Sequence, residues 1–243
     1  MTNKKCKVLG YDVDLLSFDE ALNFAVEKMQ HDSFLHIITI NPEIIALADK
    51  DKTLSDIIKN SELVLPESSG IKTALKFKGI NQEQIAGIDY SKKLIQKCAE
   101  LDFPIALIGA KEHVIQKTIS NLKSEFPNLN IAYAHNGYFD NDTEIIQNIK
   151  DNKPKFVLCA LGAPKQEKFI NKCKAEYSNA VYIGIGGSFD VWAGEVERAP
   201  QIFQKAGLEW LYRTVKQPSR IKRIYKTLPM FLFRAIIDSM KNK

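Results

Sequence analysis

The stretch that decides the fold is Phe156-Val157-Leu158-Cys159-Ala160-Leu161, followed at once by Gly162-Ala163-Pro164-Lys165-Gln166-Glu167. A buried strand that ends in a small residue and leads through polar groups into a helix is how open α/β sheets build ligand crevices. The start of such a helix offers unpaired N–H groups and a positive dipole end, which suit an anion such as a nucleotide diphosphate. An ordinary strand-to-helix turn explains the stretch about equally well, because the loop lacks the glycine fingerprint of dinucleotide and P-loop sites.

The same order of strand and helix repeats through the second half of the chain. Short runs of Val, Ile, Leu and Ala alternate with longer helical patterns, which predicts βαβ units in a mostly parallel sheet with helices on both faces. We therefore expect an α/β protein with a Rossmann-like core. The expected strands are 105–109, 131–134, 156–161 and 181–185, and the expected helices are 89–101, 112–126, 142–151 and 165–177.

The first half of the chain carries local signals for turns and caps. Residues 7–14 are typical of a β-hairpin with Gly10 at its turn, and Ser17 with Glu20 matches a helix-capping box. Pro42 can begin a helix, where its missing N–H costs nothing. Further strands are expected at 34–40 and 63–65, and a further helix at 71–77.

Length and cysteine usage narrow the class of protein. The 243 residues allow one large α/β domain or two small lobes. The four cysteines form no CxxC pair, which argues against a zinc site or a disulfide framework and fits a reducing cytosol. No signal-peptide pattern opens the chain and no apolar run is long enough to span a bilayer, so we expect a cytoplasmic protein.

Positive charge is concentrated near the C-terminal end. Residues 213–243 contain nine Lys or Arg and one acid, a net charge of +8, whereas residues 1–212 carry −3. We interpret 1–198 as the Rossmann-like core and 199–243 as a basic helical appendage with Pro218 and Pro229 as breakers. Such an appendage is expected to meet an anionic partner, which could be a nucleotide sugar, lipid headgroups or nucleic acid.

Within the appendage, residues 228–237 are apolar with a basic flank. The stretch is too short to span a bilayer. We favour an amphipathic helix that lies in the membrane interface, because the local charge is so one-sided. A helix packed on the body or on another subunit is the alternative, which leaves a homo-oligomer open.

Polar residues that end the expected strands are candidates for the site, since ligands bind beyond the carboxyl ends of parallel strands. Glu67 follows Pro66 and could accept a proton from a sugar hydroxyl as general base, although residue type alone favours a loop acid or a helix cap. Thr39 and Asn41 share one side of a strand end, where a hydroxyl and an amide suit a ligand rich in hydroxyls. Asn41 could equally cap the helix that begins at Pro42.

Glycines and polar groups at the remaining strand ends extend the candidate crevice. Lys165 and Gln166 begin a helix within reach of a base or a phosphate, and Asp190 could hold a sugar hydroxyl or cap the next turn. The glycines that share this position at the ends of strands are Gly109, Gly162 and Gly187.

Four arginines form the candidate cationic set. Guanidinium groups suit the bidentate geometry of phosphate and the charge that develops as a diphosphate leaves. Solvated arginines on a surface helix are the alternative interpretation. The four are Arg198, Arg213, Arg220 and Arg223.

With these residues in place, the chain resembles the WecG/TagA/CpsF family of bacterial glycosyltransferases over nearly its whole length. The resemblance rests on many motifs in the right order. They are Thr39-Ile40-Asn41-Pro42-Glu43, Pro66-Glu67-Ser68-Ser69-Gly70, Ala86-Gly87-Ile88-Asp89, Asn136-Gly137-Tyr138-Phe139, Leu161-Gly162-Ala163-Pro164-Lys165-Gln166-Glu167, Gly184-Ile185-Gly186-Gly187-Ser188-Phe189-Asp190, Ala193-Gly194, Arg198-Ala199-Pro200, and Gly207-Leu208-Glu209-Trp210-Leu211-Tyr212-Arg213, completed by Pro218, Arg220 and Arg223.

The resemblance implies an inverting, metal-independent transfer of an N-acetylated sugar from a UDP-sugar to a polyprenyl-diphosphate-linked acceptor in cell-surface polysaccharide synthesis. UDP-N-acetylmannosamine or its uronic acid is the implied donor, and no cofactor is expected. The appendage is implied to join the active site and to touch the membrane, which would place the protein peripherally at the inner face of the cell membrane.

The resemblance also implies residue roles. A loop carboxylate serves as the base, which falls here on Glu67, and appendage arginines stabilise the departing UDP, which falls on Arg213, Arg220 and Arg223. Thr39, Asn41 and Gln166 match family pocket positions. Together with the strand-end candidates, the expected substrate-binding set is Thr39, Asn41, Gly109, Tyr138, Gly162, Lys165, Gln166, Gly187, Asp190 and Arg198.

Two positions depart from the family pattern. The family has Pro-Asp-Gly where this chain has Pro66-Glu67-Ser68, so the carboxylate is kept but moved by one methylene. The family favours an arginine shortly before the Ala-Gly pair, where this chain has Gln84. These departures bear on donor choice and on activity.

Two other functions stay open at this point. A nucleotide- or RNA-binding module would use the basic appendage to hold phosphates and would show strongly salt-dependent binding without turnover. A degenerate family member would bind a UDP-sugar without catalysis. Of the two partners named here, nucleic acid is less favoured than a UDP-sugar.

Overall fold

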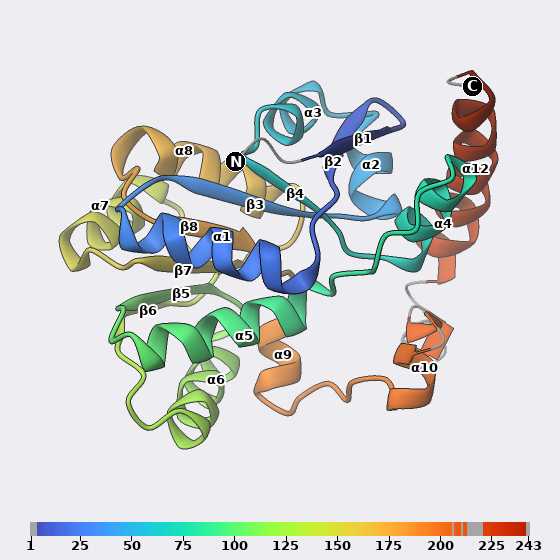
Figure 1. Cartoon of the computed structure of the whole chain (residues 1–243). Helices are drawn as coiled ribbons and strands as arrows, with labels where there is room; N and C mark the ends of the chain where they lie inside the picture. Colours follow the sequence, from blue (N-terminus) through green and yellow to red (C-terminus); the bar gives the residue numbers. More distant parts are fainter. Residues whose placement is uncertain (1–3, 206, 210, 213–220, 242–243) are drawn as a thin grey trace.

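The computed structural model describes residues 4–205, 207–209, 211–212 and 221–241, and its centre is a parallel sheet (Figure 1). Six strands pair in the order β4-β3-β8-β7-β5-β6, all parallel. Their bounds are β3 Leu35–Ile40, β4 Leu63–Pro66, β5 Ile105–Gly109, β6 Ile131–His135, β7 Phe156–Ala160 and β8 Val181–Gly184. The α/β prediction is confirmed, with strands within a residue or two of the expected ranges.

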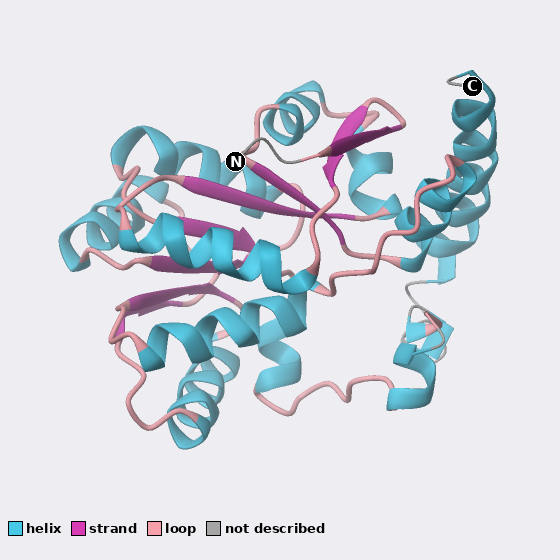
Figure 2. Ribbon diagram, in the orientation of Figure 1, coloured by secondary structure: helices cyan, strands magenta, loops and turns pink. Residues whose placement is uncertain are grey.

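The strands are continuous apolar runs because both faces of the sheet are covered by helices (Figure 2). Along β7, Phe156 and Leu158 join the core on one face, whereas Val157 and Cys159 join the core on the other. The first face is packed by α1 Phe18–Gln30, α5 Gly87–Glu100, α6 Glu112–Glu125 and α9 Ser188–Trp192. The second face is packed by α2 Pro42–Ala48, α3 Lys52–Lys59, α4 Ser69–Phe77, α7 Asp142–Asn152 and α8 Lys165–Glu176.

The chain leaves the carboxyl ends of the strands in two directions. After β5 and β8 it enters α6 and α9 on the first face, and after β3, β4, β6 and β7 it enters helices on the second face. Neighbouring strands whose connections leave to opposite faces open a crevice between them. This sheet therefore has openings where β8 lies between β3 and β7, and where β5 lies between β7 and β6.

The N-terminal hairpin protects an edge of the sheet. Strands β1 Lys5–Val8 and β2 Tyr11–Asp14 pair antiparallel around Leu9 and Gly10, which both have positive φ. The buried Asp14 carboxylate accepts the N–H of Val64 on edge strand β4 at 2.9 Å. An exposed strand edge invites pairing with another chain, and the hairpin covers this one.

Local capping explains several helix starts. Ser17 and Glu20 form the expected capping box at α1. Helix α3 was absent from the sequence expectations. Its start is fixed by Asp51, which accepts the N–H of Leu54, and its apolar residues are packed against the second face.

The described part of the appendage folds back on the body, in orange and red in Figure 1. Helix α10 Gln201–Lys205 is short, and α12 Ile221–Lys241 packs along α4 and α2 through the buried Phe231 and Ala235. Arg234 forms an ion pair with Asp49 of the body. The division at 198/199 into core and appendage stays a prediction.

The expectation that Pro229 breaks the appendage is wrong, because α12 continues through it. Proline removes one backbone hydrogen bond from a helix. Beyond Pro229, burial of apolar side chains against the body and an ion pair of Lys78 with Asp238 at 2.7 Å hold the last turns in place. Pro218 lies outside the described residues.

Candidate active site

A cavity of about 610 Å³ lies at the carboxyl ends of β3, β4, β7 and β8. Its walls come from the loops that follow these strands, from the start of α5 and from the described part of the appendage. The appendage residues that line it are Gln204, Gly207, Glu209, Thr227 and Leu228. The core and the appendage therefore border one common cavity.

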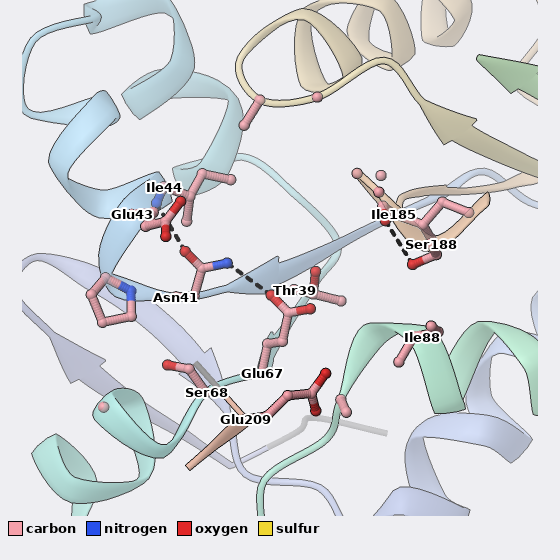
Figure 3. Close-up of a pocket in the computed structure, with 18 of the residues that line it drawn as sticks. Thr39, Asn41, Glu43, Ile44, Glu67, Ser68, Ile88, Ile185, Ser188 and Glu209 are labelled. Carbon is pink, nitrogen blue, oxygen red and sulfur yellow. Dashed lines mark hydrogen bonds between the residues drawn. The ribbon is translucent and has the colours of Figure 1, made fainter. Parts of the chain in front are cut away.

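Glu67 projects into this cavity from the loop between β4 and α4 (Figure 3). Its position is fixed by the sheet, because its N–H donates to the carbonyl of Ile40 at 3.1 Å. Its side chain is half-buried, and its Oε2 accepts a hydrogen bond from Asn41 Nδ2 at 2.8 Å. A carboxylate held on a rigid strand end by an amide is poised to take a proton from a bound hydroxyl.

Asn41 makes two hydrogen bonds, and one of them confirms the capping interpretation, while its contact with a ligand stays a prediction. Its Oδ1 accepts the N–H of Ile44 at 3.0 Å and so caps α2, while its Nδ2 orients Glu67. The side chains of Thr39 and Asn41 both lie beside Glu67 in Figure 3. The start of α5 comes equally close, since a Cβ on Gly87 would lie 2.9 Å from Glu67 Oε1 and 3.1 Å from Thr39 Cγ2.

Gln166 is a brace between two loops. Its Oε1 accepts the backbone N–H of Gly162, after β7, and of Gly186, after β8, both at 3.1 Å. Two backbone donors converge on this atom, so it must be the amide oxygen, and Nε2 faces Glu167. A Cβ on Gly184 would lie 2.4 Å from Gln166 Nε2, so glycine there leaves room for the brace.

Glu167 also lines this cavity, whose other carboxyl groups belong to Glu43, Glu67, Asp190 and Glu209. It is only 2% exposed, its Oε1 accepts Gln166 Nε2 at 2.8 Å, and its Oε2 has no hydrogen-bond partner. Burial, with a smaller contribution from repulsion by Glu67, raises the pKa of Glu167. Sequence reasoning missed this residue as a site candidate, although it ends the decisive motif.

A second hollow of about 650 Å³ opens beside the first, over the ends of β5, β6 and β7. Tyr138 lines it and is 72% exposed, and its N–H donates to Asn136 Oδ1 at 2.8 Å. Lys165 donates to the carbonyl of Gly137 at 3.1 Å and lies 4.7 Å from the ring centre of Phe139. The hollow thus presents an exposed aromatic face and a lysine.

Asp190 lines both hollows and connects them. It belongs to the short α9, whose N-cap is Gly187. Gly162 and Gly187 line the main cavity. Gly109 ends β5 with φ of +133°, and a Cβ there would lie 2.4 Å from the carbonyl oxygen of Ala160, so only glycine fits this approach of two strands.

Arg198 is already engaged by the body. Its Nη1 and Nη2 each donate to Asp89 in the first turn of α5, at 2.5 Å. The hydrogen bonds that Arg198 donates to Asp89 raise the pKa of Arg198, and Glu209 of the appendage adds a smaller contribution. In this arrangement the guanidinium joins the end of the core to α5 rather than facing an open phosphate site.

The remaining predicted cations fall where the structure gives no side chain. Arg213 and Arg220 lie outside the described residues, and Arg223 lies in α12 with its side chain undescribed. Gln84, at the position where the family favours arginine, lines the main cavity.

The described part of the chain contains no group of three His, Cys, Asp or Glu side chains placed to hold a metal ion. Three Asp-x-Asp patterns occur, at 12–14, 49–51 and 140–142, and in each at least one carboxylate is engaged by the protein itself. Asp51 accepts the N–H of Leu54 at the start of α3. Asp14 accepts the N–H of Val64 in the hairpin pattern, and Asp142 pairs with Lys172 in the pattern that begins α7.

Comparison with known proteins adds a family. A family model described as the glycosyl transferase WecG/TagA/CpsF family matches residues 6–243. The chain is 38% identical over 208 residues to a curated protein of Bacillus subtilis (strain 168), N-acetylglucosaminyldiphosphoundecaprenol N-acetyl-beta-D-mannosaminyltransferase. That match covers 85% of this chain and 80% of the relative.

Proposed function

Since the chain belongs to the WecG/TagA/CpsF family of glycosyl transferases and is a glycosyltransferase, we propose that it transfers N-acetylmannosamine. The donor is UDP-linked, and the acceptor is a polyprenyl-diphosphate-linked N-acetylglucosamine. The relative's name supports the sugar and the lipid acceptor. One observation carries the proposal for this chain: Glu67, oriented by Asn41, faces a cavity that the appendage also lines.

The donor spans the two hollows in this proposal. The exposed ring of Tyr138 offers a stacking surface for uracil, and Asp190 can accept hydrogen bonds from ribose hydroxyls. The diphosphate crosses the glycine turns at Gly162 and Gly187, and the sugar enters the main cavity toward Thr39. This order follows the strand ends from β6 to β3.

Glu67 is the general base of the proposed reaction. The acceptor hydroxyl oxygen attacks the anomeric carbon of the sugar, the bond from that carbon to the UDP oxygen breaks, and the hydroxyl proton passes to Glu67. Attack from the face opposite the leaving group inverts the anomeric carbon, so an α-linked donor gives the β-linked product that the relative's name specifies. Asn41 keeps the carboxylate aimed during this step.

The leaving diphosphate needs positive charge. We assign this role to Arg213, Arg220 and Arg223, since guanidinium groups stabilise charge that develops on phosphate oxygens. Transfer is then expected to proceed without a metal ion. An assay with and without EDTA checks this expectation, and loss of activity that Mg²⁺ or Mn²⁺ restores would contradict it.

We also propose that α12 rests on the membrane that holds the lipid acceptor. None of the described helices is both long and apolar enough to cross a bilayer. The face of α12 opposite Phe231 and Ala235 is nevertheless apolar and open to solvent. Its exposed residues are Met230, Phe233, Ile236, Ile237 and Met240. Lys222, Arg223 and Lys226 precede this face in the sequence, as expected for contact with anionic lipids.

Sedimentation with anionic lipid vesicles tests this docking surface. The double variant Met230→Glu and Phe233→Glu is expected to bind roughly a hundredfold more weakly, because two apolar side chains no longer leave water. The control Leu101→Glu changes an exposed leucine at the end of α5 and should bind as the unaltered chain does. Unchanged binding of the double variant would contradict the assignment.

The reaction itself is tested by release of UDP and formation of lipid-linked disaccharide. UDP-N-acetylmannosamine, its uronic acid and UDP-N-acetylglucosamine are compared as donors on a polyprenyl-diphosphate N-acetylglucosamine acceptor. We expect turnover with UDP-N-acetylmannosamine above the other two. Absence of transfer with every donor would refute the proposal.

A further inference from the structure

Glu167 occupies an unusual position for a carboxyl group. It lies in the first turn of α8, it is 2% exposed, and it lines the main cavity. One oxygen is satisfied by Gln166, whose own amide is fixed by two backbone N–H groups, so the carboxyl group cannot turn freely. The other oxygen, Oε2, is left without a partner.

A buried polar atom without a partner typically costs about 1–3 kcal/mol, so such an atom in a cavity is explained when a bound ligand supplies the partner. The position of Glu167 in the fold fits this explanation. Glu167 follows the turn after β7, between the hollow over β5 and β6 and the base on the β4 loop. In the proposed path of the donor, Glu167 lies beside the passage from the diphosphate at the glycine turns to the sugar near Thr39, close enough to Glu67 for their charges to interact.

We propose that Glu167 is a sugar-binding residue that acts as a neutral carboxylic acid and donates a hydrogen bond from Oε2 to an oxygen of the donor sugar. This inference rests on the proposed function. The carbonyl oxygen of an N-acetyl group is the best-matched acceptor, because it can only accept and a protonated carboxyl group can donate.

The surroundings of Glu167 favour its neutral form. Burial and the nearby Glu67 carboxylate raise its pKa, while the hydrogen bonds from Gln166 and from its own N–H lower it by less. Burial, with smaller contributions from Cys173 and Glu167, raises the pKa of the Cys159 thiol on β7. A buried carboxyl group that keeps its proton can donate a hydrogen bond inside a cavity.

The sign of the pH effect follows from this arrangement. The proton on Glu167 is present below its pKa and lost as pH rises through it. Sugar binding should therefore weaken on the alkaline side, and the charged form would repel Glu67 across the cavity. Replacement by glutamine keeps an N–H donor that does not titrate.

Steady-state transfer kinetics of the full chain test the inference with three variants. Glu167→Gln should retain most of the turnover and should lose the alkaline decline of kcat/KM. Glu167→Leu should lose roughly ten- to a hundredfold in kcat/KM for UDP-N-acetylmannosamine. Its affinity for UDP alone, measured by calorimetry, should stay within about threefold, because UDP lacks the transferred sugar. Glu176→Gln, an exposed acid at the far end of α8, is the matched charge control.

Several results would overturn the inference. They are a Glu167→Leu enzyme with unaltered kinetics, a Glu167→Gln enzyme as impaired as Glu167→Leu, or equal losses of UDP and donor affinity. If Glu167→Leu does not fold, the pH profile of Glu167→Gln decides, and an unchanged alkaline limb counts against the role. Failure of the proposed function looks different, since the unaltered chain would then show no transfer at all.

Discussion

Replacing Gln166 with alanine separates a structural role from a ligand-binding role at the centre of the site. The side chain makes three hydrogen bonds, two from the N–H groups of Gly162 and Gly186 and one to Glu167. Each buried group left unpaired costs about 1–3 kcal/mol, and water that enters from the cavity recovers part of it. We therefore expect Gln166→Ala to lower the free energy of unfolding by about 2–4 kcal/mol.

Urea unfolding followed by circular dichroism measures this loss. The midpoint should fall while the slope of free energy against urea stays constant, because the surface exposed on unfolding is unchanged. Calorimetry under folding conditions should find UDP affinity within about threefold. Gln116→Ala on α6 is the control, since this exposed amide bonds only to Glu112 in the described contacts, and it should cost under about 0.5 kcal/mol. An unchanged midpoint together with UDP binding weakened more than tenfold would contradict the structural role of Gln166.

Two further predictions concern stability. Gly109→Ala places a Cβ 2.4 Å from the Ala160 carbonyl oxygen at a positive φ, so unfolding should become about 2–5 kcal/mol easier. Gly79→Ala, with positive φ but open space, should lose clearly less, and equal losses in urea would contradict the steric argument. His36 is buried with its pKa lowered to about 3, chiefly by burial, so the unfolded chain binds a proton that the folded chain excludes as pH falls below about 6.5. His36→Leu should remove about 2 kcal/mol of the stability that is lost between pH 7 and 5. Urea unfolding at both pH values measures this, and an equal loss of unfolding free energy in the two proteins would contradict it.

Most of the sheet could be predicted because buried parallel strands are continuous apolar runs with clear ends. The range 105–109 matches β5 to the residue, and the capping box at Ser17 was visible from spacing alone. Helix α3 was missed because it is short and its only start signal is Asp51. The path through Pro229 depends on tertiary packing that local sequence rules do not contain.

The location of the site could be predicted from the sequence, whereas the hydrogen bonds among its side chains could not. Strand-end residues such as Thr39, Asn41 and Glu67 do meet in one cavity. Gln166 looked like a ligand contact, yet its brace depends on two glycines that only the folded sheet brings together. Glu167 looked like an ordinary helix residue, because burial next to a second carboxylate has no signal in a single sequence.

The measurement that tests the central claim most directly is transfer by Glu67→Ala beside UDP binding by the same protein. If Glu67 is the base, kcat for transfer should fall by roughly a hundred- to ten-thousandfold. Affinity for UDP, measured by calorimetry, should stay within about threefold, because in the proposed path UDP contacts the hollow at Tyr138 and the glycine turns rather than Glu67. A Glu67→Ala enzyme that transfers sugar at nearly the unaltered rate would contradict the account.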